Sequence, residues 1–218
     1  MSYLGRFNYI FKDKYFLTVS GRYDGSSRLS ENNRWQFFPS AAVAWRISNE
    51  EFLKNNKTIS NLKLRASWGN TGSQAVSPYS TLSTFSTTSV YLDGANPFLG
   101  YLPGTIGNAN LGWENTEQLD VGLDLDLFDS RMSLTVDYYQ KQTNDLLFKR
   151  EVPLSSGYGT SIQNVGSIEN KGYEFSLSTR NFVGSLFSWT TNLNLSANRA
   201  KVLDLADTPS GDEVEILA

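Results

Sequence analysis

The chain has 218 residues, a formal net charge of −3 and neither cysteine nor histidine, which excludes disulfides, thiolate nucleophiles, Ser-His-Asp triads and zinc sites built on those side chains. The acidic balance and the lack of a basic run argue against nucleic acid as a partner. Aromatic residues make up 13% of the chain and proline is scarce, which is typical of β-structure with polar loops.

Alternation of polar and apolar residues predicts four strands in about the first third of the chain. The short turn Lys12–Lys14 joins the first two strands, and a polar connection over residues 25–35 leads to the third. Residues 49–60 form a longer connection, in which Asn49 is expected to cap a short helical turn over residues 50–53. The four strands cover residues 3–11, 15–24, 40–48 and 62–68.

The clearest pattern lies in residues 119–127, after a long loop over residues 69–114 that is rich in Ser, Thr, Gly, Asn and Pro. Leucine and valine at every second position form one face, and Asp120, Asp124 and Asp126 lie on the other. The alternation resumes at residue 132, which predicts a β-hairpin with two long arms. Its carboxylates would be costly in a dry core, but they suit the wet lumen of a membrane barrel or the solvent face of a soluble sheet.

Two more strands follow a second long loop over residues 147–168. They cover residues 172–182 and 187–198, with the short turn Val183–Ser185 between them. The resulting eight or so strands are joined alternately by short turns and by longer or more polar loops. This alternation is typical of an up-and-down barrel across an outer membrane, and a Greek-key sandwich has no reason to show it.

Aromatic residues flank the short turns, where the interfacial girdle of a membrane barrel belongs. The expected girdle residues are Tyr9, Phe11, Tyr15, Phe16, Phe128, Phe182 and Phe187. No run of 18 apolar residues occurs, so we expect strands rather than helices to cross the membrane. The favoured fold class is all-β, an antiparallel up-and-down transmembrane β-barrel segment open at both edges. The alternative is a secreted, soluble β-sandwich that binds glycans.

Several short phrases occur in order along almost the whole chain: GRFNY at 5–9, RYDGSSR at 22–28, FPSAAVAWRI at 38–47, NLKLRASWG at 61–69, LGWE at 111–114, VDYY at 136–139 and NVGSIENKGYE at 164–174. In this combination the sequence resembles the SusC/RagA family of TonB-dependent outer-membrane receptors of Bacteroidetes. Each phrase alone is short, and their order and spacing make the match specific.

The resemblance implies an internal segment from the later part of a barrel of about 22 strands that is plugged by an N-terminal domain. It implies location in the outer membrane, in contact with its lipid, and import of oligosaccharides or peptides. A SusD-like surface lipoprotein would act as lid, and TonB would supply energy through an N-terminal region. We expect residues 1–200 to form the barrel segment and residues 201–218 to begin a truncated extracellular loop.

The same resemblance leaves parts of the family without a counterpart in this sequence: the signal sequence, the TonB box, the plug and the terminal strands. We therefore expect that the segment alone does not transport.

The sequence offers two sets of candidate site residues. Asp120, Asp124, Asp126 and Asp137 could suggest a glycosidase pair or a Ca²⁺ site, but a lumen lining explains them, and neither a catalytic residue, a metal ligand nor a cofactor is expected. Aromatic residues in the long loops could stack on sugars or contact peptides, but the favoured interpretation is that they pack the loops against one another. These are Tyr79, Phe85, Tyr91, Phe98, Tyr101, Trp113 and Tyr158. No ligand-binding residue is assigned.

Overall fold

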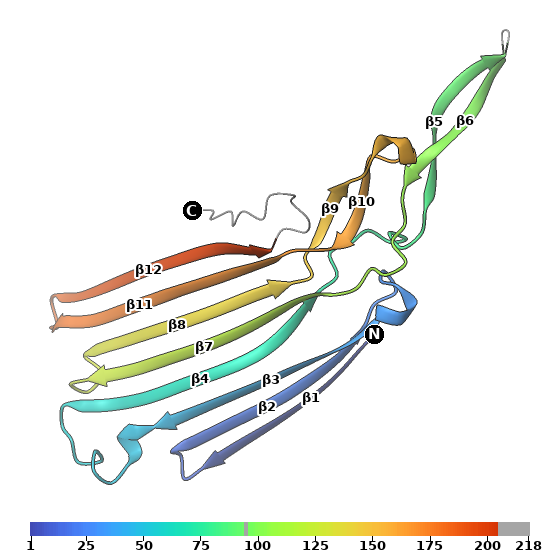
Figure 1. Cartoon of the computed structure of the whole chain (residues 1–218). Helices are drawn as coiled ribbons and strands as arrows, with labels where there is room; N and C mark the ends of the chain where they lie inside the picture. Colours follow the sequence, from blue (N-terminus) through green and yellow to red (C-terminus); the bar gives the residue numbers. More distant parts are fainter. Residues whose placement is uncertain (94–95, 205–218) are drawn as a thin grey trace.

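The main element of the computed structural model, which describes residues 1–93 and 96–204, is one antiparallel sheet of eight strands. Figure 1 shows it as a curved, open wall with β1 and β12 at its edges. The spatial order is β1-β2-β3-β4-β7-β8-β11-β12, which confirms the predicted up-and-down arrangement. The strands are β1 (Ser2–Phe11), β2 (Tyr15–Gly25), β3 (Trp35–Arg46), β4 (Ile59–Ser73), β7 (Glu114–Leu127), β8 (Met132–Asn144), β11 (Ser167–Val183) and β12 (Ser188–Asp204).

The wall strands contain 10 to 17 residues, whereas strands of globular proteins average about 5–6. Such lengths are sufficient for a tilted strand to cross a bilayer. The short connections lie together at one end of the wall and the long loops at the other, as predicted (Figure 1). Among the described residues, no helix is long and apolar enough to span a membrane.

The tightest connections are turns with left-handed backbone. Lys12 and Asp13 have φ of 52° and 53°, and the amide of Lys14 donates to the carbonyl of Phe11 at 3.0 Å. Positive φ at both central residues gives the turn a twist that matches that of the flanking strands, and Lys14 is one extra residue of the connection, since Phe11 pairs with Tyr15. Asp129 and Ser130 also have positive φ, and the amide of Arg131 donates to the carbonyl of Phe128 at 3.1 Å, which closes the turn between β7 and β8.

The two long loops contain strands that the sequence did not predict. β5 (Thr84–Asp93) pairs with β6 (Asn96–Thr105), and β9 (Leu147–Glu151) pairs with β10 (Thr160–Asn164). Both hairpins project from the loop end of the wall (Figure 1). The β5–β6 pairing contains two register shifts, which explains why no sustained alternation is visible there. Short 3₁₀ segments occur at η1 (Glu31–Asn33), η2 (Ile47–Asn49) and η3 (Leu154–Ser156).

Several predicted boundaries differ from the structure, among them those of β4, which continues to Ser73, and of β11, which begins at Ser167. β3 begins at Trp35, because Trp35 pairs with Gly25 and extends the ladder into the stretch assigned to a connection. β12 continues to Asp204, beyond the expected boundary at residue 200. Asn49 does not cap the following turn, since its amide donates instead to the backbone and side-chain oxygens of Asp13 at 2.9 and 3.2 Å.

Candidate functional site

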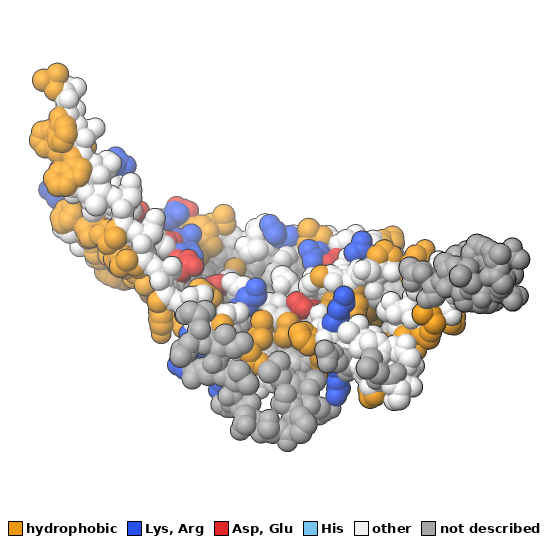
Figure 2. Space-filling view, turned by 90° about the horizontal axis from the view of Figure 1, so that it is seen from above, with side chains coloured by type: hydrophobic (Ala, Val, Ile, Leu, Met, Phe, Trp, Pro, Cys, Tyr) orange, Lys and Arg blue, Asp and Glu red, His pale blue; other side chains and the backbone are white. Residues whose placement is uncertain are grey.

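The strand registers give the wall one apolar and one polar face. On the apolar face, Val43, Ala66 and Val121 lie in one row across β3, β4 and β7. The next positions along these strands point the other way and include Arg65 and Ser67 of β4 and Asp120 of β7. Val43 and Val121 are 53% and 45% exposed. At the arm that projects at the upper left of Figure 2, hydrophobic side chains follow one side, and few are seen on the other.

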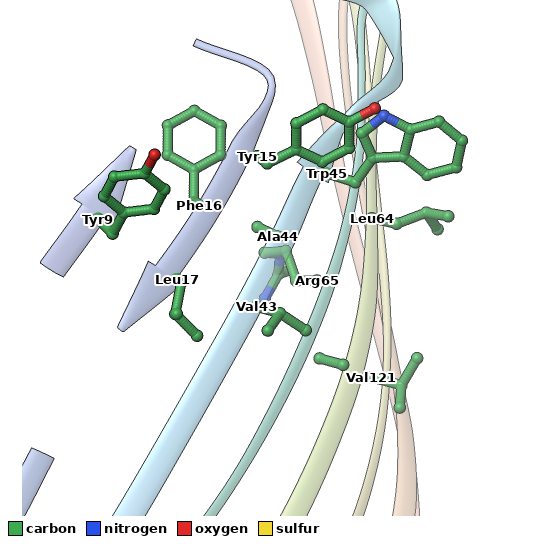
Figure 3. A pocket seen from close by; sticks show the side chains of 11 residues that line it. Tyr9, Tyr15, Phe16, Leu17, Val43, Ala44, Trp45, Leu64, Arg65 and Val121 are labelled. Carbon is green, nitrogen blue, oxygen red and sulfur yellow. The ribbon is translucent and has the colours of Figure 1, made fainter. Parts of the chain in front are cut away.

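Aromatic side chains border the apolar face at the turn end. Tyr9, Phe11, Tyr15 and Trp45 follow one another with ring centroids 6.4 Å apart. Figure 3 shows Tyr9, Tyr15 and Trp45 around a hollow of about 520 Å³ that Leu64 and Val121 also line. We call this row, together with the exposed rings of Phe128, Phe182 and Phe187, the turn-end belt. The predicted girdle is therefore present at these positions.

Phe16 is the exception among the predicted girdle residues. It pairs with Ala44, in a row that leads to Arg65 on the polar face. Its ring contacts two cations there, Arg46 at 5.2 Å and Lys63 at 5.5 Å from the ring centroid. The girdle prediction is wrong for Phe16 because successive residues of a strand point to opposite faces, and Tyr15 already occupies the apolar one.

A second belt borders the apolar face at the loop end. The ring of Trp35 stacks with Tyr23 at 5.0 Å and lies 6.2 Å from Tyr3, and Tyr138 contacts Tyr173 at 5.0 Å on the neighbouring part of the wall. We call these five residues the loop-end belt. Tyr15 and Tyr23 lie about 26 Å apart along β2 at ~3.3 Å per residue. With a strand tilt of about 40°, the apolar band between the belts is roughly 20 Å high, close to that of a membrane barrel.

The belts are staggered from strand to strand. Tyr15 lies in the same row as Phe175 of β11, whereas the turn-end aromatic residue of β11 is Phe182. A register shift between Arg180 and Phe182 brings Phe182 opposite Trp189 of β12. The displacement of the turn-end belt from β2 to β11 corresponds to the shear that tilted barrel strands require.

The polar face is held by a charge network that crosses three strands. Arg65 of β4 binds both carboxylate oxygens of Asp124 on β7, at 2.9 and 3.1 Å, and Asp137 of β8 at 2.9 Å. Gly122 lies between Arg65 and Asp137 in the same row. A Cβ at Gly122 would collide with Asp137 and would lie 2.7 Å from Cζ of Arg65. The missing side chain of Gly122 therefore lets the guanidinium reach across β7.

This network changes the interpretation of the predicted carboxylate ladder. Asp124 and Asp137 share one guanidinium, and Asp120 accepts hydrogen bonds from Gln118 at 2.9 Å and Ser67 at 3.4 Å. Asp120, Asp124 and Asp137 are thus components of a paired polar wall, and Asp126 lies on the same face opposite Asn61 and Ser133. A lumen lining needs no further role for these acids. Among the described residues, no group of three or more acidic side chains could hold a metal ion.

A groove of about 530 Å³ lies on the same polar face towards the loop end. Arg6 and Arg22 line one side of it, and Gln118 and Asp120 line the other. Hydrogen-bond donors and acceptors on both sides make this surface suited to a polar solute.

A small hydrophobic core packs the loops above the wall. Its buried residues are Leu29, Phe38, Val76, Leu111 and Trp113. Trp113 meets the ring of Phe38 edge-on at 5.4 Å, and its indole N–H donates to the carbonyl of Arg34 at 3.2 Å. For Trp113, the structure therefore supports loop packing rather than ligand binding.

The other loop aromatics differ in their surroundings. Tyr79, Phe85 and Tyr101 are 72%, 70% and 68% exposed, and Tyr158 is partly buried. The side chains of Tyr91 and Phe98 lie outside the described residues. Exposed rings on loops above a rigid wall remain candidates for stacking on a ligand.

Glu50 forms a second polar cluster that sequence reasoning missed, at the turn end. Its carboxylate accepts from the ammonium of Lys14 at 2.8 Å, the hydroxyl of Tyr15 at 2.8 Å and the indole of Trp45 at 3.1 Å. These three donors lower the pKa of Glu50 from its usual value of 4.5 to about 2. The cluster ties the β3–β4 connection to the turn between β1 and β2. Its spacing in sequence gave no signal, because the partners meet only after the strands pair.

The family described as TonB dependent receptor-like, beta-barrel matches residues 2–214. The chain belongs to the TonB-dependent receptor family. Its place is therefore the outer membrane, with the apolar face towards lipid and the polar face towards the lumen.

Several members of the TonB-dependent receptor family are similar to the chain. It is 47% identical over 217 residues to TonB-dependent receptor P3 of Formosa agariphila, covering 99% of this chain and 21% of that protein. It is 35% identical over 217 residues to TonB-dependent receptor SusC of Bacteroides thetaiotaomicron, covering 97% of this chain and 22% of that protein.

The solved structure of the RagAB peptide importer in its closed-closed state matches with a TM-score of 0.86 and 31% identity, over 95% of this chain and 22% of that one. The chain thus spans about a fifth of the length of these relatives. The resemblance to SusC and RagA is confirmed. The chain itself forms a segment of the barrel wall.

Proposed function

We propose that the chain forms part of the barrel wall of a receptor that imports oligosaccharides or peptides across the outer membrane. The observation that carries the proposal is the wall itself, an apolar face between two aromatic belts backed by a charge-paired polar face with a groove. This arrangement matches a lipid-exposed surface and a wet passage on opposite sides of one sheet.

The relatives favour a nutrient importer. RagAB is named a peptide importer and SusC a TonB-dependent receptor. In this proposal, a surface lipoprotein of the SusD type closes the loop end, and TonB acts through an N-terminal region. The wall contributes passage and recognition, not catalysis. The exposed rings of Tyr79, Phe85 and Tyr101 are the candidates for first contact with the solute.

A soluble glycan-binding sandwich is the competing function. It requires a second sheet against one face of the wall, and among the described residues no second sheet covers either face. The two remaining small sheets are hairpins at the loop end (Figure 1).

Uptake by cells tests the proposal. The gene for the whole receptor is deleted, and uptake of labelled oligosaccharide mixtures and of labelled peptide mixtures is measured with and without an intact TonB. We expect one class of solute to lose TonB-dependent uptake and complementation to restore it. Unchanged uptake of both classes, or recovery of the receptor in a soluble fraction, would refute the proposal.

A receptor with Tyr79, Phe85 and Tyr101 all changed to alanine tests the loop contribution. We expect a raised half-saturation concentration with normal amounts of receptor in the outer membrane. Phe128→Ala, an exposed ring at the opposite end, is the matched control and should leave uptake unchanged.

A further inference from the structure

The hollow beside the turn-end belt has a floor of short side chains. Val43, Ala66 and Val121 lie next to one another in one row across β3, β4 and β7, and Ala66 has only a methyl group between the two valines. Longer side chains border this floor, because Trp45 and Leu64 occupy the next row towards the turns. Together they surround a space of about 520 Å³ on the apolar face (Figure 3). We call it the turn-end hollow.

Two further side chains border the turn-end hollow towards β1. Tyr9 pairs with Leu17, and Leu17 pairs in turn with Val43. Both Tyr9 and Leu17 line the hollow. The row therefore descends from a ring through a leucine and a valine to the methyl group of Ala66, so the hollow is bordered on two sides and open to the surroundings of the wall.

A carboxylate fixes the rings at the rim of the turn-end hollow. Glu50 accepts hydrogen bonds from the hydroxyl of Tyr15 at 2.8 Å and from the indole N–H of Trp45 at 3.1 Å. The two rings are stacked with an interplanar angle of 11°. Their polar atoms are thus engaged by Glu50, and their carbon atoms remain to line the hollow. Walls that are held in place before a ligand enters reduce the entropy cost of binding.

The chemistry of the turn-end hollow suits a hydrocarbon chain. Arg65 also borders the hollow, but its guanidinium binds Asp124 and Asp137 on the opposite face of the wall. A polar solute would lose its hydration in this space without gaining hydrogen-bond partners. The surrounding apolar face is the lipid-facing side of the barrel, and short turns of outer-membrane barrels are periplasmic. The molecules available to the hollow are therefore lipids of the periplasmic leaflet.

We propose that the turn-end hollow is a binding site for one acyl chain of a phospholipid in the periplasmic leaflet. The headgroup lies level with Tyr15 and Trp45, at the depth where aromatic belts meet the polar part of a bilayer. The chain then passes over Val43 and Ala66 towards the middle of the membrane. Ala41, the next outward residue of β3 and again a short one, extends this path to ~13 Å from Trp45.

Packing distinguishes this site from the rest of the lipid-facing surface. Lipid tails are about as apolar as leucine, so hydrophobicity alone gives a tail no preference for one part of the apolar face. A tail that lies in a hollow touches atoms on several sides and gains more van der Waals contacts than a tail on a flat surface. The inference depends on the position of the family in the outer membrane and not on which solute is imported.

Lipid retention by the whole receptor tests this site. The receptor is purified in a non-ionic detergent, stripped of lipid and titrated with palmitoyl-oleoyl phosphatidylethanolamine, and bound lipids are counted by native mass spectrometry. Ala66→Leu fills the floor of the hollow, and Val43→Phe fills it from the neighbouring strand. Because the preference comes from packing, we expect each variant to weaken binding of the tightest lipid on the order of fivefold.

The matched control is Ala197→Leu. Ala197 of β12 belongs to the same row as Ala66 and lies outside the hollow, so the same substitution there should leave lipid retention unchanged. Ala66→Gly keeps the hollow open and should also retain the lipid. Heat-modifiable migration shows that each variant has a folded barrel.

The fluorescence of Trp45 locates the bound chain. Phosphatidylethanolamine that is brominated on its acyl chain quenches nearby tryptophans, and the contribution of Trp45 is the difference between the receptor and its Trp45→Phe variant. We expect this contribution to be quenched in a saturable manner with one lipid per receptor. The saturable quenching should be reduced in Ala66→Leu and unchanged in Ala197→Leu.

Three outcomes would overturn the proposal. Equal weakening in Ala66→Leu and Ala197→Leu would indicate general contact with lipid. Unchanged retention in both folded variants that fill the hollow would show that the tightest lipid lies elsewhere, as would saturable binding without quenching of Trp45. Because the readouts are lipid binding and fluorescence, they are independent of whether the receptor imports a sugar or a peptide.

Discussion

Gly122 offers the sharpest test of the polar face, because the Arg65 network passes over it. In Gly122→Ala, the new Cβ would collide with Asp137 and lie 2.7 and 2.8 Å from Cζ and Nη2 of Arg65. Real Cβ contacts are not that short, so the guanidinium or the Asp137 carboxylate must move. The contact that should be lost is the 2.9 Å bond between Arg65 and Asp137.

The expected cost follows from two contributions. Inserting a methyl group into a filled space costs roughly 1–3 kcal/mol. The lost ion pair adds little, on the order of 0.2–1 kcal/mol, since the side chains of Arg65 and Asp137 are 37% and 27% exposed. We therefore expect Gly122→Ala to lower the free energy of unfolding of the whole barrel by about 2 kcal/mol.

The assay is urea unfolding of the whole receptor in lipid vesicles, followed by tryptophan fluorescence and by migration of unheated samples. Gly5→Ala is the matched control, because a Cβ at Gly5 meets nothing within 4 Å. It should be neutral or slightly stabilising, since alanine loses less backbone entropy than glycine on folding.

A double-mutant cycle isolates the physical cause. In an Asp137→Ala background, the collision with Asp137 is removed and the guanidinium of Arg65 is no longer held there, so it can move aside and Gly122→Ala should cost less than in the unchanged receptor. Equal costs in the two backgrounds would refute the reasoning, as would a Gly122→Ala variant as stable as Gly5→Ala.

Three further predictions address the other parts of the wall. Glu50→Gln should destabilise the turn end at neutral pH. Because the native pKa of Glu50 is lowered to about 2, the stabilisation by its carboxylate is fully present above about pH 4.5 and is lost as the pH falls through about 2. The unfolding curves of the unchanged and Glu50→Gln receptors should therefore converge at low pH. Leu123→Arg should cost about 2–4 kcal/mol at mid-membrane, and Thr135→Arg on the polar face much less, by the same urea assay; similar costs would contradict the facing. Trp113→Ala should cost roughly 3 kcal/mol in loop stability, measured as faster protease cleavage of the loops with an intact barrel; unchanged cleavage would contradict its packing role.

Strand order and facing could be predicted from the sequence because both depend on local patterns. Alternation between residues 119 and 127 assigns each side chain to a face, and short turns such as Lys12–Lys14 force adjacent strands to pair. Alternation also places Phe16 on the face opposite Tyr15. The prediction that Phe16 belongs to the girdle was wrong because it relied on how close Phe16 lies to the turn and not on this alternation. Trp35 was missed because the adjacent rings of Phe37 and Phe38 hide the period of two.

The site residues were less predictable because they depend on register. Arg65, Gly122 and Asp137 are far apart in sequence and meet only when β4, β7 and β8 align. Trp113 resembled any exposed loop aromatic until the packing of three separate loop segments buried it at 9% exposure. Sequence patterns thus specify which way a residue points, but not which residues face each other across strands.

The stagger of the aromatic belts has a geometric consequence for this wall. A displacement of roughly one residue per strand corresponds to an incline of about 40° from the membrane normal. Side chains at equal depth are therefore found along a diagonal, such as Tyr23 on β2 and Tyr173 on β11, rather than among ladder partners. A solute that moves through the lumen along the membrane normal would therefore pass from one strand to the next. If solute-contacting residues are exchanged between two related receptors, the exchanged set should follow that diagonal and not the boundaries of single hairpins.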